Sequence, residues 1–252
     1  MPAQTIDEVL VQLDEIIART RREKSRLGFF AVLYRNVTLK VREGIKAGLF
    51  EDGPRMERLD VTFANRYLSA YESFQRGEQL SKCWLVAFEA AALWPPIILQ
   101  HLLIGMNAHI NFDLGIAAAE VAPGGQLQSL KHDFDQINNI LGGMVAKVKS
   151  NVDELSPWIN LIDRLVDAQA GDQIINFSLT KARQSAWLVA TMVAQSSSSQ
   201  REKKLAVLDD AVAAFGRLIR KPVGVLLNLG LWVVRLRESN DIPRVIDVLS
   251  QM

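Results

Sequence analysis

Apolar residues recur along the chain every three or four positions, which is the period of an amphipathic α-helix. The first such run extends from about residue 5 to about residue 25. Thr5 and Glu8 open it with the T-x-x-E spacing of a capping box, in which each side chain satisfies a free backbone amide. The pattern therefore predicts a helix over about 5–25 with this buried face: Ile6, Val9, Leu10, Leu13, Ile16 and Ile17.

Proline, glycine and serine divide the rest of the chain into further helical segments. In one of them, NVTLKV (36–41) alternates as a strand would and two glycines weaken a helix, but we predict a helix there too. No hairpin signal and no repeat of 30–45 residues is present. The sequence predicts an all-α fold, a single multi-helix bundle of roughly ten helices, with these further segments: 29–48, 54–76, 82–94, 97–122, 126–150, 156–169, 172–195, 201–220, 223–237 and 242–250.

The segment QHLLIGMNAHINFDLGIAAAEVA (100–122) sets polar residues within an apolar helix. At about 100° per residue, His101, His109 and Asp113 share one face. Gly105 lies between them, and we expect it to leave room for an ion, a water molecule or a substrate. Two asparagines lie on the opposite side and are expected to bond to another helix: Asn107 and Asn111.

Three more carboxylates occupy positions where their helices are otherwise apolar: Asp60, Glu89 and Asp135. A buried carboxylate without a partner costs several kcal/mol or becomes protonated, so each needs a cationic neighbour. The candidates are a metal ion, a protonated histidine, or an arginine such as Arg66 or Arg183.

The first functional hypothesis is a metal-dependent enzyme, a hydrolase whose metal ion activates a bound water molecule. His109 and Asp113 are one helical turn apart, so both can reach a common ion, although an ordinary His–Asp pair has the same spacing. The ion would be zinc, manganese or iron, and His101 and Asp135 would be the catalytic groups that move the proton. The metal ligands would be His109, Asp113, Asp60 and Glu89.

The second hypothesis is a metal-free helical protein that binds a small, largely apolar ligand, as an isomerase or cyclase or as a binding module. His101, His109 and Asp113 would then form a hydrogen-bonded network. Other polar and aromatic side chains can line the same cavity and contact the ligand: Tyr67, Asn138, Arg183 and Trp187. A third possibility is a structural module that binds a partner protein.

Composition and charge limit the classes of partner and the cellular location that we expect for this protein. The 252 residues carry a formal net charge of +1, which disfavours nucleic acid as a partner. The chain has no leader-like start and a single cysteine, Cys83, so we expect a cytoplasmic protein. The apolar run at 223–234 is shorter than the ~20 residues that cross a bilayer, so we expect no stable membrane insertion. The oligomeric state is left open.

Several well-known sites lack their motifs. No E-x-x-H pair of a ferritin-like di-iron site is present, and no H-E-x-x-H, G-x-G-x-x-G, P-loop or G-x-S-x-G motif occurs. The all-helical zinc phospholipase C and nuclease group, in which H-x-x-x-D pairs bind zinc, is an analogy at the level of the fold.

Four segments resemble a known bacterial family: HLLIGMNAHINFDLGIAAA (101–119), RLDVTFANRYLSAY (58–71), AFEAA (87–91) and DFDQINNIL (133–141). The chain resembles the family called domain of unknown function 5995 over about residues 27–195. The resemblance implies a helical fold with the His/Asn/Asp segment as its hallmark, and it implies no reaction. Residues 200–252 are expected to form a C-terminal helical extension packed on that core.

Overall fold

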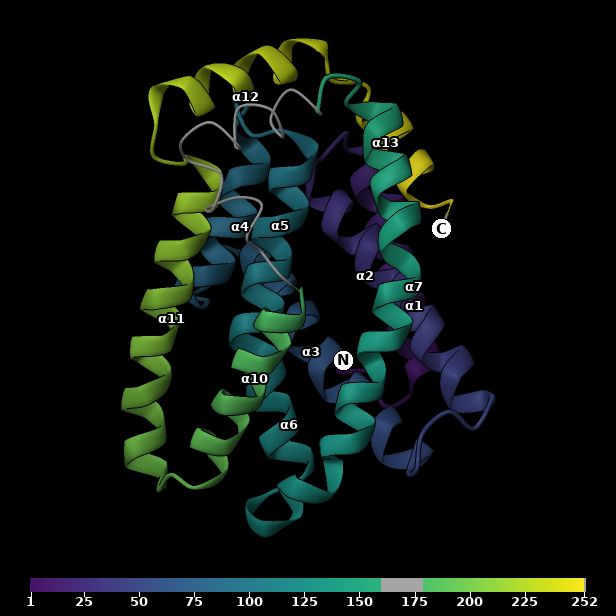
Figure 1. Cartoon of the computed structure of the whole chain (residues 1–252), viewed down its shortest axis with the longest axis vertical. Helices are drawn as coiled ribbons and strands as arrows, with labels where there is room; N and C mark the ends of the chain where they lie inside the picture. Colours follow the sequence, from purple (N-terminus) through teal and green to yellow (C-terminus); the bar gives the residue numbers. More distant parts are fainter. Residues whose placement is uncertain (160–178, 252) are drawn as a thin grey trace.

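The computed structural model describes residues 1–159 and 179–251, and within these ranges it contains helices and no strands. Figure 1 shows their arrangement as a bundle. If α5, a π-helical turn η1 and α6 are counted as one continuous helix, the described part has ten α-helices. Their bounds are α1 (Ile6–Arg22), α2 (Leu27–Lys46), α3 (Gly53–Arg76), α4 (Lys82–Ala92), α5 (Ile98–Ala108), η1 (His109–Leu114), α6 (Gly115–Val121), α7 (Lys131–Leu155), α10 (Leu179–Ala194), α11 (Ser198–Arg220), α12 (Val225–Arg237) and α13 (Ile242–Leu249).

The predicted helices are present with some changes. The alternating segment 36–41 is helical, within α2. Thr5 caps α1 by accepting a hydrogen bond from the Glu8 backbone amide. The expected helix 126–150 begins later, because Gly124–Leu130 forms a 3-10 turn, and it continues to Leu155. Most of the helix expected at 156–169, and the start of the one at 172–195, lie outside the described residues.

The continuous helix Ile98–Val121 is the centre of the bundle. It packs against α2, α3, α4, α10 and α11, so helices enclose it from several sides (Figure 1). Among the described residues it is the one stretch long and apolar enough to span a membrane, and 83% of its most apolar window is buried inside the protein. An apolar helix of this kind is typical of a buried core helix.

The C-terminal helices are tied to the same core. The Glu238 carboxylate, just after α12, accepts hydrogen bonds from the Ile98 backbone amide at 2.9 and 3.0 Å. Asn36 on α2 and Asn151 on α7 donate to backbone carbonyl groups of α13, those of Leu249 and Val248. These contacts satisfy free backbone groups at the buried start of α5 and at the end of α13.

Candidate functional site

The π-helical turn η1 contains both residues of the H-x-x-x-D motif, His109 and Asp113, and their side chains line different hollows. A π-turn holds one more residue per turn than an α-helix and rotates the side chains that follow. His109 lines a cavity on the side of α2 and α3, whereas Asp113 lines a different hollow, of about 590 Å³, which the polar side chains of Gln12 and Gln79 also line. His109 Nδ1 and the nearest Asp113 oxygen are 3.7 Å apart, beyond hydrogen-bond range.

Asp113 has its own partners. One carboxylate oxygen accepts a hydrogen bond from Arg66 Nε at 2.9 Å, and the other accepts one from the Trp84 indole at 2.7 Å. The guanidinium of Arg66 is also 3.6 Å from Glu120. An arginine and an indole therefore neutralise and satisfy this buried carboxylate, which is one of the alternatives that the sequence left open.

The cavity beside His109 is the best-formed candidate site. Its volume is about 430 Å³, within the range of small-molecule sites, and it lies between α2, α3, α5, η1, α7 and α10. Its lining follows α7 from Ile137 to Asp153, a distance of roughly 24 Å at 1.5 Å per residue. Most of the wall consists of leucine, isoleucine, valine, methionine and phenylalanine side chains.

Four buried polar residues interrupt this apolar wall. Three of them, Tyr34, Asp60 and His109, come from α2, α3 and η1, and the fourth is Arg183 on α10. The Tyr34 hydroxyl, Asp60 Oδ2 and both ring nitrogens of His109 have no hydrogen-bond partner among the described residues. The His109 ring stacks on Phe63 with centroids 3.5 Å apart, and the Tyr34 ring is 4.3 Å away. Asp60 and Phe63 are three residues apart on α3, so Asp60 lies on the same face as the ring that holds His109.

Burial sets the charge of these three groups. It raises the pKa of Asp60 to about 8, with a smaller contribution from the charge of Glu57. It lowers the pKa of His109 below its ordinary value, and Asp113 opposes only part of that change. It also raises the pKa of the Tyr34 phenol. All three side chains are therefore uncharged at pH 7, and Asp60 is a carboxylic acid that can donate a hydrogen bond.

The charged side chains that line the cavity come from α7 and α10. Lys149 and Asp153 are on α7, where the neighbouring Val145 is 54% exposed, so this part of the wall reaches solvent. Arg183 on α10 is buried, and burial lowers its pKa to about 10, which leaves it charged at neutral pH. Arg183 and Asn138, both predicted to contact a ligand, are joined by a hydrogen bond of 2.8 Å.

Arg183 is held rigidly at the wall. Its guanidinium donates to the Phe134 carbonyl oxygen and is 4.4 Å from the centre of the Phe134 ring. Trp187, one turn further along α10, packs on the same phenylalanine with ring centroids 5.1 Å apart and does not line the cavity. Tyr67 is buried against Trp84 in the core and is likewise outside the cavity wall.

His101 is buried, but it does not reach the cavity or the other nominated groups. Its ring meets Phe29 edge-on at 5.8 Å, and burial together with the charges of Arg26 and Arg235 lowers its pKa to about 3. The expected gap at Gly105 is also absent, because a Cβ there would lie 2.6 Å from the Phe30 ring. The expectation that Gly105 opens the helix to a ligand was wrong, since an aromatic ring fills that space.

Two nominated carboxylates lie on outer faces. Glu89 is exposed on α4, and Asp135 is exposed on α7 in an ion pair with Lys131. The expectation that these two carboxylates are buried was therefore wrong, because each helix has apolar residues on more than one side. Neither carboxylate approaches His101 or His109 as the predicted metal site requires.

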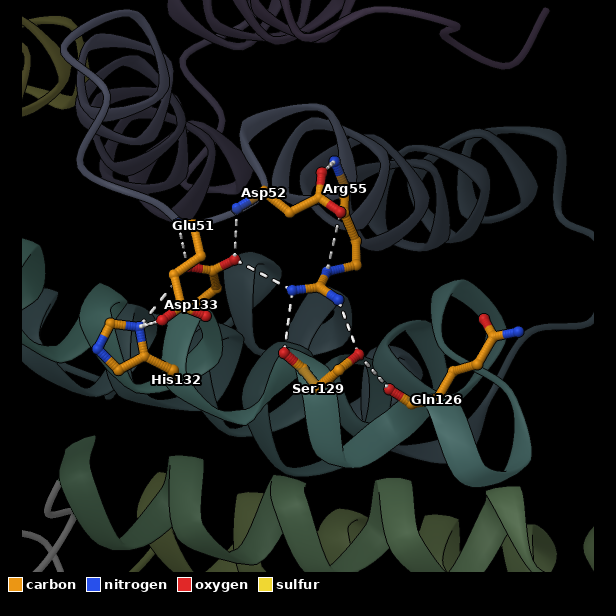
Figure 2. Close-up of polar contacts among 7 residues, drawn as sticks. All are labelled: Glu51, Asp52, Arg55, Gln126, Ser129, His132 and Asp133. Carbon is orange, nitrogen blue, oxygen red and sulfur yellow. Dashed lines mark hydrogen bonds and ion pairs between the residues drawn. The ribbon is translucent and has the colours of Figure 1, made fainter.

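One group of possible metal ligands does form within the described ranges: Glu51, His132 and Asp133. Figure 2 shows that the Asp133 carboxylate is already engaged, because it accepts hydrogen bonds from the backbone amides of Glu51 and Asp52 and from Arg55. Glu51 and His132 are 62% exposed. This arrangement fastens the start of α3 to the start of α7.

The comparisons with known proteins place the chain in a family. Residues 6–222 match the family model described as Family of unknown function (DUF5995). The chain belongs to this family. The match begins earlier and ends later than the 27–195 expected from the motifs. No curated protein and no solved structure matches the chain.

Sequence reasoning missed Tyr34 and the cavity itself. Tyr34 lies in the apolar run GFFAVLY (28–34), where an aromatic residue fits a core position equally well. The cavity lies between helices that are far apart in sequence, among them α2, α5 and α7, and a helical period does not report the distance between two helices. The one available signal was Asp60, a carboxylate on a face that also carries Phe63 and Tyr67.

Proposed function

We propose that the protein binds a small, largely apolar molecule in the cavity between α2, α3, α5 and α7, without a metal ion. The observation that carries this proposal is an apolar cavity of about 430 Å³ in which buried polar atoms of Tyr34, Asp60 and His109 have no hydrogen-bond partner among the described residues. Buried polar groups are normally paired, so unpaired groups that face a cavity are suited to a ligand that supplies the missing hydrogen bonds.

The charge state of the cavity indicates the class of ligand. Tyr34 and protonated Asp60 donate hydrogen bonds, and neutral His109 can donate one and accept one. None of these three neutralises a charge, and the charged Arg183 is already bonded to Asn138 and to the Phe134 carbonyl oxygen. A carboxylate or an ammonium group therefore gains little in the cavity. We therefore expect an elongated apolar molecule that carries a carbonyl or hydroxyl oxygen.

The geometry gives less support to the metal-dependent hydrolase. Asp113 is satisfied by Arg66 and Trp84, and Glu89 lies on the outer surface. This leaves His109 and Asp60 as the nominated ligands at the cavity, fewer than the three protein ligands that catalytic zinc sites use.

The same groups provide an acid and a base for isomerisation. Asp60 can donate a proton to the carbonyl oxygen while His109 removes a proton from the α-carbon, which gives a dienol. His109 then delivers its proton to the γ-carbon, and the dienol O–H returns its proton to Asp60, so the double bond moves into conjugation and both residues are restored. The unpaired His109 nitrogens favour this second activity. If the protein is such an isomerase, it should convert a long-chain β,γ-unsaturated ketone to its conjugated isomer, which is measured by ultraviolet absorbance. The H109Q variant should not carry out this conversion.

The binding proposal is tested with Nile red, an uncharged fluorescent probe, in competition with tetradecanol, tetradecane and tetradecanoic acid. We expect tetradecanol to displace the probe most effectively. Leu103→Trp, which fills the cavity from α5, should weaken probe binding at least tenfold. Leu188→Trp, at a site on α10 that is 70% exposed, is the matched control and should bind as the wild type does. Equal binding by a folded Leu103→Trp variant would contradict the proposal.

A further inference from the structure

Helix α12 is apolar on both of its sides. Leu227, Leu231 and Val234 are buried against the bundle. The opposite side carries a stripe of exposed side chains at spacings of three and four residues, the positions that share one side of a helix. This stripe consists of Val225, Leu229, Trp232 and Leu236, with Leu226 beside it. Isolated exposed leucines are ordinary, but a continuous apolar stripe marks a surface that meets another apolar phase.

Two more exposed tryptophans lie beside this helix. The Arg235 guanidinium is 5.1 Å from the ring of Trp94, and that of Arg237 is 5.2 Å from the ring of Trp158. Trp94, Trp158 and Trp232 are each between 42% and 50% exposed. Tryptophan is enriched where a protein meets the headgroup region of a bilayer, since its ring is apolar and its N–H needs a polar partner.

The charged side chains in the segment around α12 are basic. Residues 211–237, which include α12, contain five basic side chains and no acidic one, although the whole chain has a net charge of only +1. Arg235, one of the five, is buried and lies 3.7 Å from Glu238, so the other four carry the positive charge of this segment. Lys221, just before α12, and Arg237, its last residue, are exposed at the two ends of the stripe. Basic residues around an apolar helical face are typical of helices that lie in the interface of a membrane with anionic lipids.

We propose that α12 and the three exposed tryptophans form a surface that docks on an anionic lipid bilayer. The helix lies across one end of the bundle, over the ends of α4 and α5, where it can face a planar surface (Figure 1). The docking is peripheral, because α12 is shorter than the ~20 residues of a membrane span and its inner side is committed to the protein core.

The surface and the cavity share one end of α7. The cavity lining includes Val152 and Ile159, and the Ser239 amide just after α12 donates to the Leu155 carbonyl oxygen at 3.0 Å. A protein that takes an apolar molecule from a bilayer benefits from such proximity. The docking surface nevertheless depends on its own residues and does not require that the cavity binds a ligand.

Vesicle flotation of the full chain tests the proposal. We expect at least fivefold more protein to float with vesicles of 70% phosphatidylcholine and 30% phosphatidylglycerol than with pure phosphatidylcholine, and high salt should reduce the difference. The double variant L229D/W232D should lose at least nine-tenths of this binding. A matched double variant, L188D/V207D, changes two side chains of similar exposure on α10 and α11 and should bind as the wild type does.

Three results would overturn the proposal. One is wild-type protein that floats with neither vesicle. Another is vesicle binding that survives L229D/W232D or that L188D/V207D abolishes equally. The third is a dimer, seen by sedimentation velocity, that L229D/W232D dissociates in the absence of vesicle binding, which would assign the surface to a second copy of the chain. Leu103→Trp separates this proposal from the cavity, since it should retain vesicle binding.

Discussion

The carboxyl group of Asp60 is uncharged at neutral pH because it faces an apolar cavity. Its folded-state pKa of about 8 lies above the ordinary value of 3.8, so its contribution to stability is full below pH 3.8 and is lost as the pH rises through 8. The buried side chain thus makes the protein progressively less stable as the pH rises from about 4 to about 8.

Asp60→Asn should remove this pH dependence. Asparagine has a similar shape and no charge, so the variant should gain about 2–4 kcal/mol of stability relative to the wild type between about pH 5 and pH 8. Urea unfolding at both pH values measures the difference. A constant difference between the two proteins across this range would show that Asp60 is already ionised in the folded state.

Asp113→Ala should destabilise the protein through lost hydrogen bonds. It leaves the Trp84 indole N–H and the Arg66 guanidinium without their partner, at a cost of about 3 kcal/mol. Asp135→Ala, which removes an exposed ion pair, should change stability by less than about 0.5 kcal/mol.

A chelator should not change the Tm of the wild-type protein, because the proposed cavity holds no metal ion. A Tm that falls when chelator is added would restore the metal hypothesis.

For individual residues, the sequence predicted some of the buried polar side chains and their bonding and misplaced others. Asn107 was expected to bond to another helix, and it donates to the Val212 carbonyl oxygen on α11 at 2.9 Å. The same expectation for Asn111 was wrong, because Asn111 donates to the side chain of Asn107 on its own helix at 3.0 Å. Asp60 and Asp113 are buried as expected, whereas Glu89 and Asp135 are exposed. The periodicity of one helix cannot distinguish these cases, because the buried side depends on where its neighbours pack.

The π-turn is the element that determines the site. A spacing of four residues fits both an α-turn and a π-turn, so the sequence predicted that His109 and Asp113 share a face. The structure assigns them to different hollows. The helix itself was predictable from its apolar run, but the additional residue within it depends on packing against α3 and α10, which lie far away in the sequence.

Deletion of Asn111 should therefore be tolerated better than deletion of Ala117. The first removes one residue from the π-turn and leaves the flanking α-helices in register, whereas the second rotates everything after it by about 100°. We expect the Asn111 deletion to lower the Tm by less than half of the decrease that the Ala117 deletion causes, with both measured by circular dichroism. Equal losses would show that the turn is not a separable insertion.

At the scale of the molecule, the sequence predicted the fold class correctly. The all-α bundle of about ten helices follows from the 3.6-residue period and from the proline and glycine positions, which are local properties. The cavity, the exposed tryptophans and the contact between Glu238 and Ile98 involve residues distant in sequence. No local pattern contains that information.

A chain that ends at residue 222, where the family match ends, should not fold cooperatively. It lacks α12 and α13 and leaves the buried start of α5 without Glu238. Thermal unfolding of the 1–222 fragment should show no sharp transition, while Glu238→Gln in the full chain should retain one at a lower Tm. A cooperative transition in the fragment would show that α12 and α13 are not required for folding.

The contact between Glu238 and Ile98 also bears on how relatives of this chain can be recombined. A chimera that joins the first 222 residues of this chain to a foreign tail keeps the Ile98 amide but replaces its acceptor, which lies 140 positions away in the exchanged part. Such a tail will succeed only if it delivers an acceptor to that one amide, so the edge of the recognised family region is a poor crossover point.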